Sequence, residues 1–338
     1  MKIKIGDITK IRTGKLDANA ADENGQYPFF TCSKEPLKIN TYSYDCECVL
    51  VAGNGDLNVK YYNGKFDAYQ RTYIIEDDSD GLLFMPYLYF FMESYIDELR
   101  KQSIGGVIKY IKLKNLTDAL IELPSTEVQR KIVNIISKSK EIVRRKENEF
   151  ELLDELVRAR FVEMFGEIED CDKWKSKIWN EVVTIKNGRD YKKVLVSDGG
   201  YPVVGTGGEI ARASKYLCPE NTIVVGRKGS INNPMLMKEK FWNVDTAFGV
   251  IPNSDYLHYQ YFYYFCKFYN FMKLNKATTL PSTTKADLLK IRINIPPLEL
   301  QNQFASFVQE IDKSRSRIQK SLEASQELFD SLMQEYFG

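Results

Sequence analysis

Two stretches of the chain, 124–166 and 296–338, carry apolar side chains at every third or fourth position. Both are poor in glycine and contain no proline beyond their opening residues. This spacing predicts two long amphipathic helices, each with one apolar stripe. The first stripe comprises Ile132, Ile136, Val143, Phe150, Leu153, Val157 and Met164. The second comprises Phe304, Val308, Ile311, Ile318, Leu322, Phe329 and Leu332. Such a helix is not stable alone in water, so we expect the two stripes to pack together.

The two stretches are copies of each other. They align without a gap at an offset of 172 residues, which places Gln129 on Gln301. The repeat continues upstream at an offset of 174, where Ile5–Lys15 matches Trp179–Arg189 and Glu47–Gly55 matches Asn221–Gly229. Beyond that point we expect the offset to return to 172, so that Tyr87–Phe90 meets Tyr259–Phe262. The chain is therefore two copies of one unit, a globular part followed by a long helix.

The globular parts show mixed patterns. The runs Val49–Val51 and Ile223–Val225 predict buried strands that enter tight loops. Asn63-Gly64 predicts a hairpin turn, and 85–102 predicts an amphipathic helix. Thr126 and Gln129 predict a capping box at the start of the first long helix. We expect an α+β fold with two mixed α/β domains at 1–122 and 167–295, and with long helices at 123–166 and 296–338.

The direction of helix pairing follows from the link between the two copies. A helix of about forty residues is roughly 60 Å long. The short link Glu167–Lys173 cannot return the chain over that distance to the start of a parallel pair. We therefore expect an antiparallel coiled coil with pseudo-two-fold symmetry.

Composition excludes several classes of protein. Hydrophobic residues make up 43% and charged residues 28% of the 338 residues, which is typical of a folded soluble chain. No apolar run approaches the roughly 20 residues that cross a bilayer, and the start lacks the core of a signal peptide. A cytoplasmic location without a membrane partner is expected. The net charge of +1 neither demands nor excludes a polyanionic partner.

Catalytic motifs are missing from the sequence. The six cysteines are scattered, and Cys46 with Cys48 forms a poor metal site without further cysteines or histidines nearby. His258 is the single histidine, and it stands in an aromatic run typical of a helix on a core. There is no P-loop, no amino-methyltransferase loop and no nuclease motif. Gly205–Gly208 is interpreted as a turn. The sequence predicts neither a catalytic site, a metal site nor a cofactor of its own.

The order of these features resembles the DNA-specificity subunit of type I restriction–modification enzymes. The strings that carry the resemblance are ELPSTEVQRKI and IPPLELQNQF, the domain openings that end in Thr13-Gly14 and Asn187-Gly188, and GRKGSI after a buried strand. The resemblance implies that each globular part is a target recognition domain for one half of a split, asymmetric double-stranded DNA sequence. It implies that the paired helices set the spacing and dock two modification subunits, which bring S-adenosylmethionine. Restriction subunits are implied as further partners.

Sequence-specific readout needs paired donors and acceptors on exposed loops, with Lys or Arg near phosphates. In the first domain the candidate loops are 53–62, 69–72 and 103–112, and in the second they are 226–233 and 278–285. The candidate DNA-binding residues are Asn54, Asn58, Lys60, Gln70, Arg71, Lys109, Tyr110, Arg227, Lys228, Ser230, Asn232, Asn233, Thr279, Ser282, Thr283 and Lys285.

Two other functions remain open on the sequence. One is a structural coiled-coil scaffold whose end domains bind proteins. The other is a stand-alone methyltransferase or nuclease, which the missing motifs disfavour.

Overall fold

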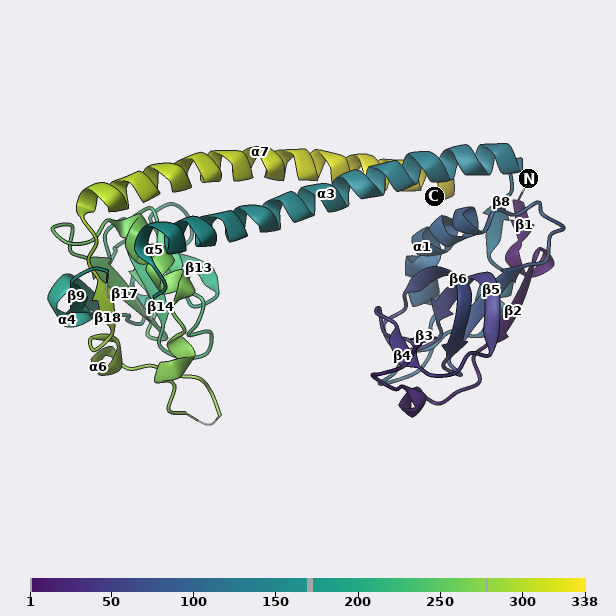
Figure 1. The fold of residues 1–338 in the computed structure, drawn as a ribbon, viewed down its shortest axis with the longest axis horizontal. Helices are drawn as coiled ribbons and strands as arrows, with labels where there is room; N and C mark the ends of the chain where they lie inside the picture. Colours follow the sequence, from purple (N-terminus) through teal and green to yellow (C-terminus); the bar gives the residue numbers. More distant parts are fainter. Residues whose placement is uncertain (1, 169–172, 278) are drawn as a thin grey trace. The chain divides into compact units, whose positions relative to one another are not determined.

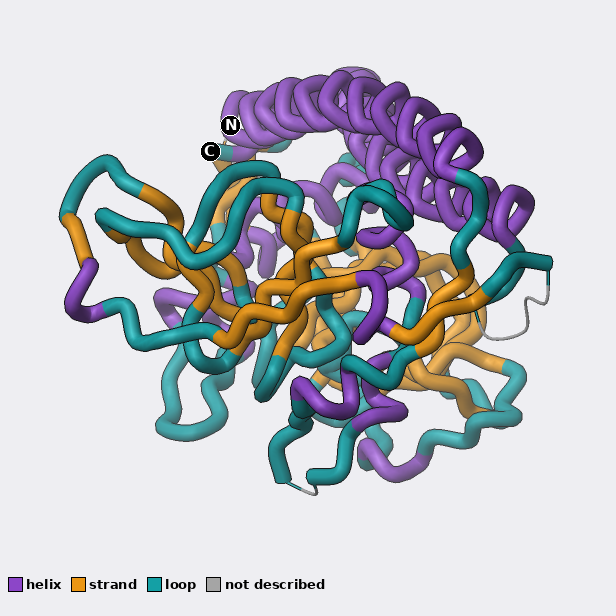
Figure 2. Tube along the Cα trace, turned by 90° about the vertical axis from the view of Figure 1, so that its left-hand side faces the viewer, coloured by secondary structure: helices purple, strands orange, loops and turns teal. Residues whose placement is uncertain are grey.

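The computed structural model describes residues 2–168, 173–277 and 279–338. The chain forms two compact units: unit 1 comprises 1–147 and 320–338, and unit 2 comprises 148–319. The link expected at Glu167–Lys173, and Cys171 within it, lie mostly outside the described residues. Figure 1 labels the elements, and Figure 2 distinguishes strands, helices and loops by colour.

A mostly antiparallel sheet forms the centre of unit 1. Its strand order is β2-β7-β5-β6-β3-β4, with β3 parallel to β6. The strands are β2 (Thr9–Thr13), β3 (Tyr27–Phe30), β4 (Leu37–Ile39), β5 (Tyr44–Ala52), β6 (Val59–Ala68) and β7 (Thr72–Asp77). A separate pair joins β1 (Lys2–Lys4) to β8 (Leu120–Glu122). The buried strand expected at Val49–Val51 is confirmed within β5.

Helix α1 (Met85–Gln102) packs its apolar face on the sheet of unit 1, as Leu88, Met92 and Leu99 are fully buried. This confirms the amphipathic helix predicted at 85–102. The short helix α2 (Leu113–Thr117) follows, and the long helix α3 (Thr126–Phe165) begins after β8.

The hairpin predicted at Asn63-Gly64 is wrong. Both residues lie inside the ten-residue strand β6, where Asn63 pairs with Glu47 and Gly64 pairs with Cys46 of β5. Gly64 has a φ of +137°, so the glycine allows an irregular strand conformation instead of a turn. The actual turns of this region are the loop 53–58 and the short connection 69–71 between β6 and β7.

Unit 2 divides its strands between two small sheets and one pair. The sheets have the orders β10-β17-β14-β15 and β11-β13-β12-β16, and β9 pairs with β18. The strands are β9 (Ser176–Ile178), β10 (Val183–Asn187), β11 (Leu195–Val196), β12 (Tyr201–Gly205), β13 (Gly208–Ala213), β14 (Thr222–Gly226), β15 (Met235–Met237), β16 (Trp242–Asn243), β17 (Ala247–Pro252) and β18 (Arg292–Asn294). The helices are α4 (Trp179–Val182), α5 (Tyr259–Phe268), α6 (Lys285–Leu288) and α7 (Leu298–Phe337). The strand expected at Ile223–Val225 is confirmed in β14, and Gly205–Gly208 is the turn between β12 and β13.

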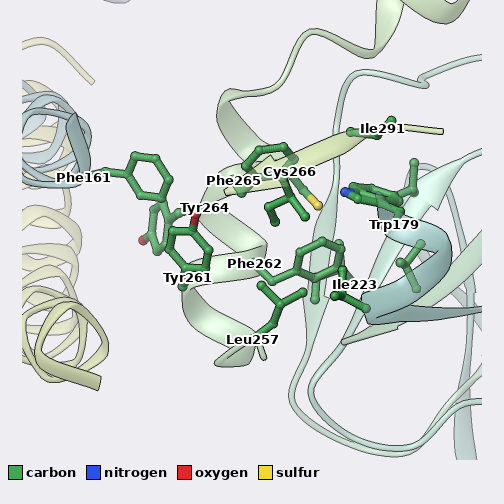
Figure 3. Close-up of a cluster of buried hydrophobic side chains, with 14 of the residues drawn as sticks. Phe161, Trp179, Ile223, Leu257, Tyr261, Phe262, Tyr264, Phe265, Cys266 and Ile291 are labelled. Atoms are coloured by element: carbon green, nitrogen blue, oxygen red, sulfur yellow. The ribbon is translucent and has the colours of Figure 1, made fainter. Parts of the chain in front are cut away.

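An aromatic core joins the sheet of unit 2 to both long helices (Figure 3). Phe161 of α3 stacks on Tyr261 of α5 at 5.6 Å between ring centroids. The rings of Phe161 and Phe304 of α7 meet edge to face at 5.5 Å. The late part of α3 therefore lies beside the early part of α7 in this unit.

In unit 1 the order is reversed. Ile132 and Ile136, near the start of α3, belong to the core on which Phe329, Leu332 and Phe337 at the end of α7 also pack. Both arrangements agree with the antiparallel order expected from the sequence. All fourteen residues predicted for the two stripes are buried or half-buried.

A buried glutamine fastens each long helix to its own globular part. Gln129 is fully buried, and its side chain accepts the N–H of Phe84 and donates to the carbonyls of Leu82 and Pro124. Gln301 likewise accepts the N–H of His258 and donates to the carbonyls of Tyr256 and Pro296. The capping box predicted for Thr126 and Gln129 is wrong, because both ends of the Gln129 amide serve this long-range clamp.

A tyrosine contact that is present in both repeats also corrects the expected register. Tyr87 donates its hydroxyl to the carbonyl of Glu122, and Tyr261 donates to that of Asn294. Tyr87 therefore corresponds to Tyr261, at an offset of 174, and the expected match of Tyr87–Phe90 with Tyr259–Phe262 is wrong. The change to 172 occurs between the starts of α1 and α5, which lie 174 residues apart, and the starts of α2 and α6, which lie 172 apart.

Among the described residues, no helix is long and apolar enough to cross a membrane. In that same part of the chain, no group of three or more His, Cys, Asp or Glu residues is placed to hold a metal ion. His258 is the N-cap of α5, where its Nδ1 accepts the N–H of Gln260.

Candidate nucleic-acid interface

In unit 1, four chain segments meet where β2, β5 and β6 end (Figure 1). Two backbone hydrogen bonds join the loop after β5 to the loop before α2. The N–H of Gly55 donates to the carbonyl of Lys109 at 2.9 Å, and the N–H of Ile111 donates to the carbonyl of Gly53 at 2.9 Å. Gly53 N–H also donates to the carbonyl of Arg71 in the β6–β7 turn at 2.8 Å. The segment after β2 is held by a hydrogen bond from the N–H of Lys15 to the carbonyl of Ala68 at 3.1 Å. Three candidate loops and one further segment therefore form a single surface.

Unit 2 repeats the same four contacts. The N–H of Gly229 donates to the carbonyl of Pro281 at 2.9 Å, and the N–H of Thr283 donates to the carbonyl of Arg227 at 3.0 Å. The backbone N–H of Arg227 donates to the carbonyl of Thr246 at 2.8 Å, and the backbone N–H of Arg189 donates to the carbonyl of Asn243 at 3.0 Å. Isolated bridges join Asn54 to Tyr110 and, in the equivalent place, Lys228 to Ser282. The loop framework is thus duplicated bond by bond.

The glycine that directly follows β2 in unit 1 and β10 in unit 2 is required by close approach. A Cβ on Gly14 would lie 2.2 Å from the carbonyl oxygen of Ala68, and one on Gly188 would lie 1.8 Å from that of Val244. Only glycine lets this segment reach the neighbouring turn at both positions. The matching TG and NG openings of the two domains are explained by this contact.

Side chains at equivalent positions of the two surfaces differ. Asn54 corresponds to Lys228, Lys109 to Pro281 and Tyr110 to Ser282, as the paired backbone contacts establish. An amide, an ammonium group, a phenol and a hydroxyl offer different donor and acceptor patterns. One framework therefore presents two different chemical surfaces.

The structure separates the candidates of unit 1 into two groups. Gln70, Arg71, Lys109 and Tyr110 are exposed on the shared surface, and Asn54 is half-buried beside them. Asn58 instead donates its amide to the carbonyls of Cys32 at 2.8 Å and Asp56 at 2.9 Å. Lys60 donates to Asn58, and burial lowers the pKa of its ammonium group. Asn58 and Lys60 thus make contacts inside the domain.

The candidates of unit 2 are more dispersed, and residue 278 of their second loop lies outside the described part. Arg227, Lys228, Ser230 and Thr279 are exposed, and Ser282 is half-buried at the bridge to Lys228. Thr283 is buried, and its hydroxyl donates to the carbonyl of Gly226 at 2.8 Å. Lys285 donates its ammonium group to the carbonyl of Ile185 at 2.9 Å.

Two candidate asparagines of unit 2 make their contacts away from the shared loop surface. Asn232 accepts the N–H of Phe271 at 2.7 Å. Asn233 lines a cavity of about 380 Å³ together with Gln260 of α5 and Arg315 of α7. Neither is among the residues that the four duplicated contacts bring together.

The structure adds residues that the sequence reasoning did not select. Lys15 in unit 1, and Lys186 and Arg189 in unit 2, are exposed at the ends of β2 and β10, beside the candidate loops. The signal that could have found them is their position within the matched openings 12–15 and 186–189. These cations increase the positive charge where phosphate contacts would be expected.

Comparisons with known proteins give this arrangement a family. A family model described as the type I restriction modification DNA specificity domain matches residues 1–152 and 171–326. The chain is 44% identical over 127 residues to the specificity subunit of the type I restriction enzyme EcoDI from Escherichia coli. That alignment covers 38% of this chain and only 28% of the relative.

Two solved structures share the fold along the whole chain. The S subunit of a type I restriction–modification system from M. genitalium matches with a TM-score of 0.68 and 16% identity, over 100% of this chain and 96% of that one. A structure described for the assembly and conformational transition of a type I restriction–modification system matches with a TM-score of 0.60 and 15% identity, over 100% and 97% of the two chains. The family model covers both repeats, so the chain belongs to the family of type I restriction–modification DNA specificity domains.

Proposed function

We propose that the chain is a non-catalytic subunit that recognises a bipartite, asymmetric DNA sequence, with one half-site for each unit. The observation that carries the proposal is the duplicated loop framework with different side chains at equivalent positions. A common framework serves a common task, and different donors and acceptors select different bases.

The same proposal assigns partners to the long helices. They dock two modification subunits, which bind S-adenosylmethionine and transfer the methyl group, and restriction subunits join the assembly. The exposed cations Lys138, Arg144, Arg145 and Arg158 of α3 are candidates for these contacts. The role of the paired helices in setting the spacing between half-sites stays a prediction.

The decisive experiment is methylome sequencing of cells that carry this chain and its modification subunits. Residues 1–122 are exchanged for the corresponding part of another family member, and 167–295 are exchanged in a second variant. Each exchange should change one half of the methylated motif and leave the other half intact. The two-reader proposal fails if one exchange alters both halves or neither.

A coiled-coil scaffold with protein-binding end domains is the alternative that this experiment tests. Such a scaffold would leave the methylation pattern independent of the loop residues. Substitution of Lys109, Arg227 and Lys228 by alanine, one at a time, therefore separates the two functions.

A further inference from the structure

One loop of unit 1 exposes an apolar tip. Ile104, Val107 and Ile108 have exposed fractions of 43%, 103% and 63%. Between them stand Gly105, with a φ of +116°, and Gly106. Exposure of several neighbouring aliphatic side chains to water is unfavourable. An exposed apolar tip of this kind is therefore expected at a site of contact with another molecule.

The base of this loop is held firmly. The N–H of Ile104 donates to the carbonyl of Tyr110 at 3.0 Å, and the N–H of Tyr110 donates to the carbonyl of Ile104 at 2.9 Å. Tyr110 also bridges to Asn54 in the neighbouring loop. The tip is therefore presented at a fixed place on the candidate interface.

The surroundings of the tip favour a polyanion. Ile108 lines a depression of about 450 Å³ with Asn54, Gly55 and Tyr69. Lys109 and Lys112 beside the tip are exposed. Asp56 lines the same depression, but it forms ion pairs with Arg100 at 3.4 Å and Lys34 at 3.9 Å. Basic charge and continuity with the candidate DNA loops indicate DNA as the occupant.

An aliphatic side chain has no donor or acceptor for a phosphate or for a polar base edge. The apolar group that a base pair presents in the major groove is the C5-methyl group of thymine. We propose that Val107 and Ile108 contact a thymine methyl group in the half-site recognised by unit 1. This inference rests on the proposed DNA-reading function and adds one base-specific contact to it.

The test uses the complex of the full chain with its modification subunits, and duplexes that carry the methylated motif. Each thymine of the unit 1 half-site is replaced in turn by uracil, which lacks only the methyl group. Burial of one such group contributes about 0.8 kcal/mol, so one replacement should weaken binding about four-fold. The Val107→Ser/Ile108→Ser double variant should bind the thymine duplex more weakly and lose its sensitivity to that replacement.

Leu120→Ser is the matched control, because Leu120 is an aliphatic residue with an exposed fraction of 54% on β8. It should keep the wild-type sensitivity to uracil. The proposal is overturned if specific binding tolerates uracil at every position of the half-site, or if the half-site contains no thymine. It is also overturned if 2-aminopurine fluorescence shows base unstacking that the Val107→Ser/Ile108→Ser variant abolishes, since the tip would then act as a wedge. A complex that recognises no motif at all would instead refute the proposed function.

Discussion

At the scale of single residues, the buried glutamines are the strongest link between sequence and structure. Gln301→Met removes two donated bonds and one accepted bond, and it leaves three backbone groups without a partner. Each loss in a buried place costs about 1 kcal/mol or more, so the free energy of unfolding should fall by about 3 kcal/mol. Urea denaturation measures this change. Gln303→Met, at an exposed site two residues away, should change stability by less than about 0.5 kcal/mol. Equal effects of the two substitutions would contradict the clamp.

His258 makes unit 2 sensitive to acid. Burial lowers the pKa of its imidazole below the usual 6.5, and its neutral Nδ1 accepts the N–H of Gln260. Above pH 6.5 both folded and unfolded chains hold the neutral ring, so the stabilisation is complete. As the pH falls below 6.5 the unfolded chain binds the proton more readily, and stability is lost until the folded pKa is passed.

The corresponding variant is His258→Asn, which keeps a capping oxygen but does not titrate. We expect the stability advantage of the wild type over this variant to shrink between pH 7.5 and pH 5.5, as followed by urea denaturation. The chain has a single histidine, so no other imidazole complicates the comparison. Parallel pH profiles for the two proteins would exclude the role given to His258.

The sequence placed Gln129 on Gln301 but assigned Gln129 the wrong partner. A capping box is a local pattern within four residues, whereas the observed partner Phe84 is 45 residues away. Contacts of this kind depend on packing that no local pattern encodes. The candidate loop residues show the same limit, since burial of Thr283 and the internal contacts of Asn58 follow from the tertiary fold.

At the scale of elements, periodic patterns were reliable, and the turn predicted at Gly205–Gly208 was correct, whereas the turn predicted at Asn63-Gly64 was not. Each long helix was predicted from an apolar stripe repeated along forty residues, and few other structures would place all these side chains on one face. Asn63-Gly64 is only two residues, and pairing with β5 on one side outweighs its turn preference. A pattern repeated along a whole helix thus predicts its element more firmly than the two-residue signal Asn63-Gly64.

The segment after β10 of unit 2 gives a prediction at this scale. Gly188→Ala forces a methyl group against the backbone of Val244, so the segment and the 244–246 turn must separate. We expect a loss of about 2 kcal/mol or more in urea denaturation, as for other overpacked sites. Gly207→Ala is the control, because its added Cβ meets no atom within 4 Å. A Gly188→Ala protein as stable as this control would show that the close approach is not required.

For the whole molecule, charge decides how DNA binding should depend on salt. The chain has 47 basic and 46 acidic residues, so its overall field supplies little attraction. Local cations on the two candidate surfaces must then carry the phosphate contacts. The cations exposed there are Lys15, Arg71, Lys109 and Lys112 in unit 1, with Lys186, Arg189, Arg227 and Lys228 in unit 2. The isolated chain should therefore bind DNA weakly, and a plot of log K against log salt should have a slope no steeper than about −7.

Lys228 tests this account within the complex with the modification subunits. If it contacts a phosphate, Lys228→Ala should weaken binding to all sequences alike and make the salt slope shallower by about 1. If it contacts a base, the slope should hold and discrimination at one position of the motif should fall. Lys238→Ala is the control, because Lys238 is an exposed cation that pairs with Asp312 of α7 at 3.5 Å. No change in affinity, slope or discrimination for Lys228→Ala would remove this surface of unit 2 from the DNA contact, because Lys228 is exposed beside the bridge that joins its two loops.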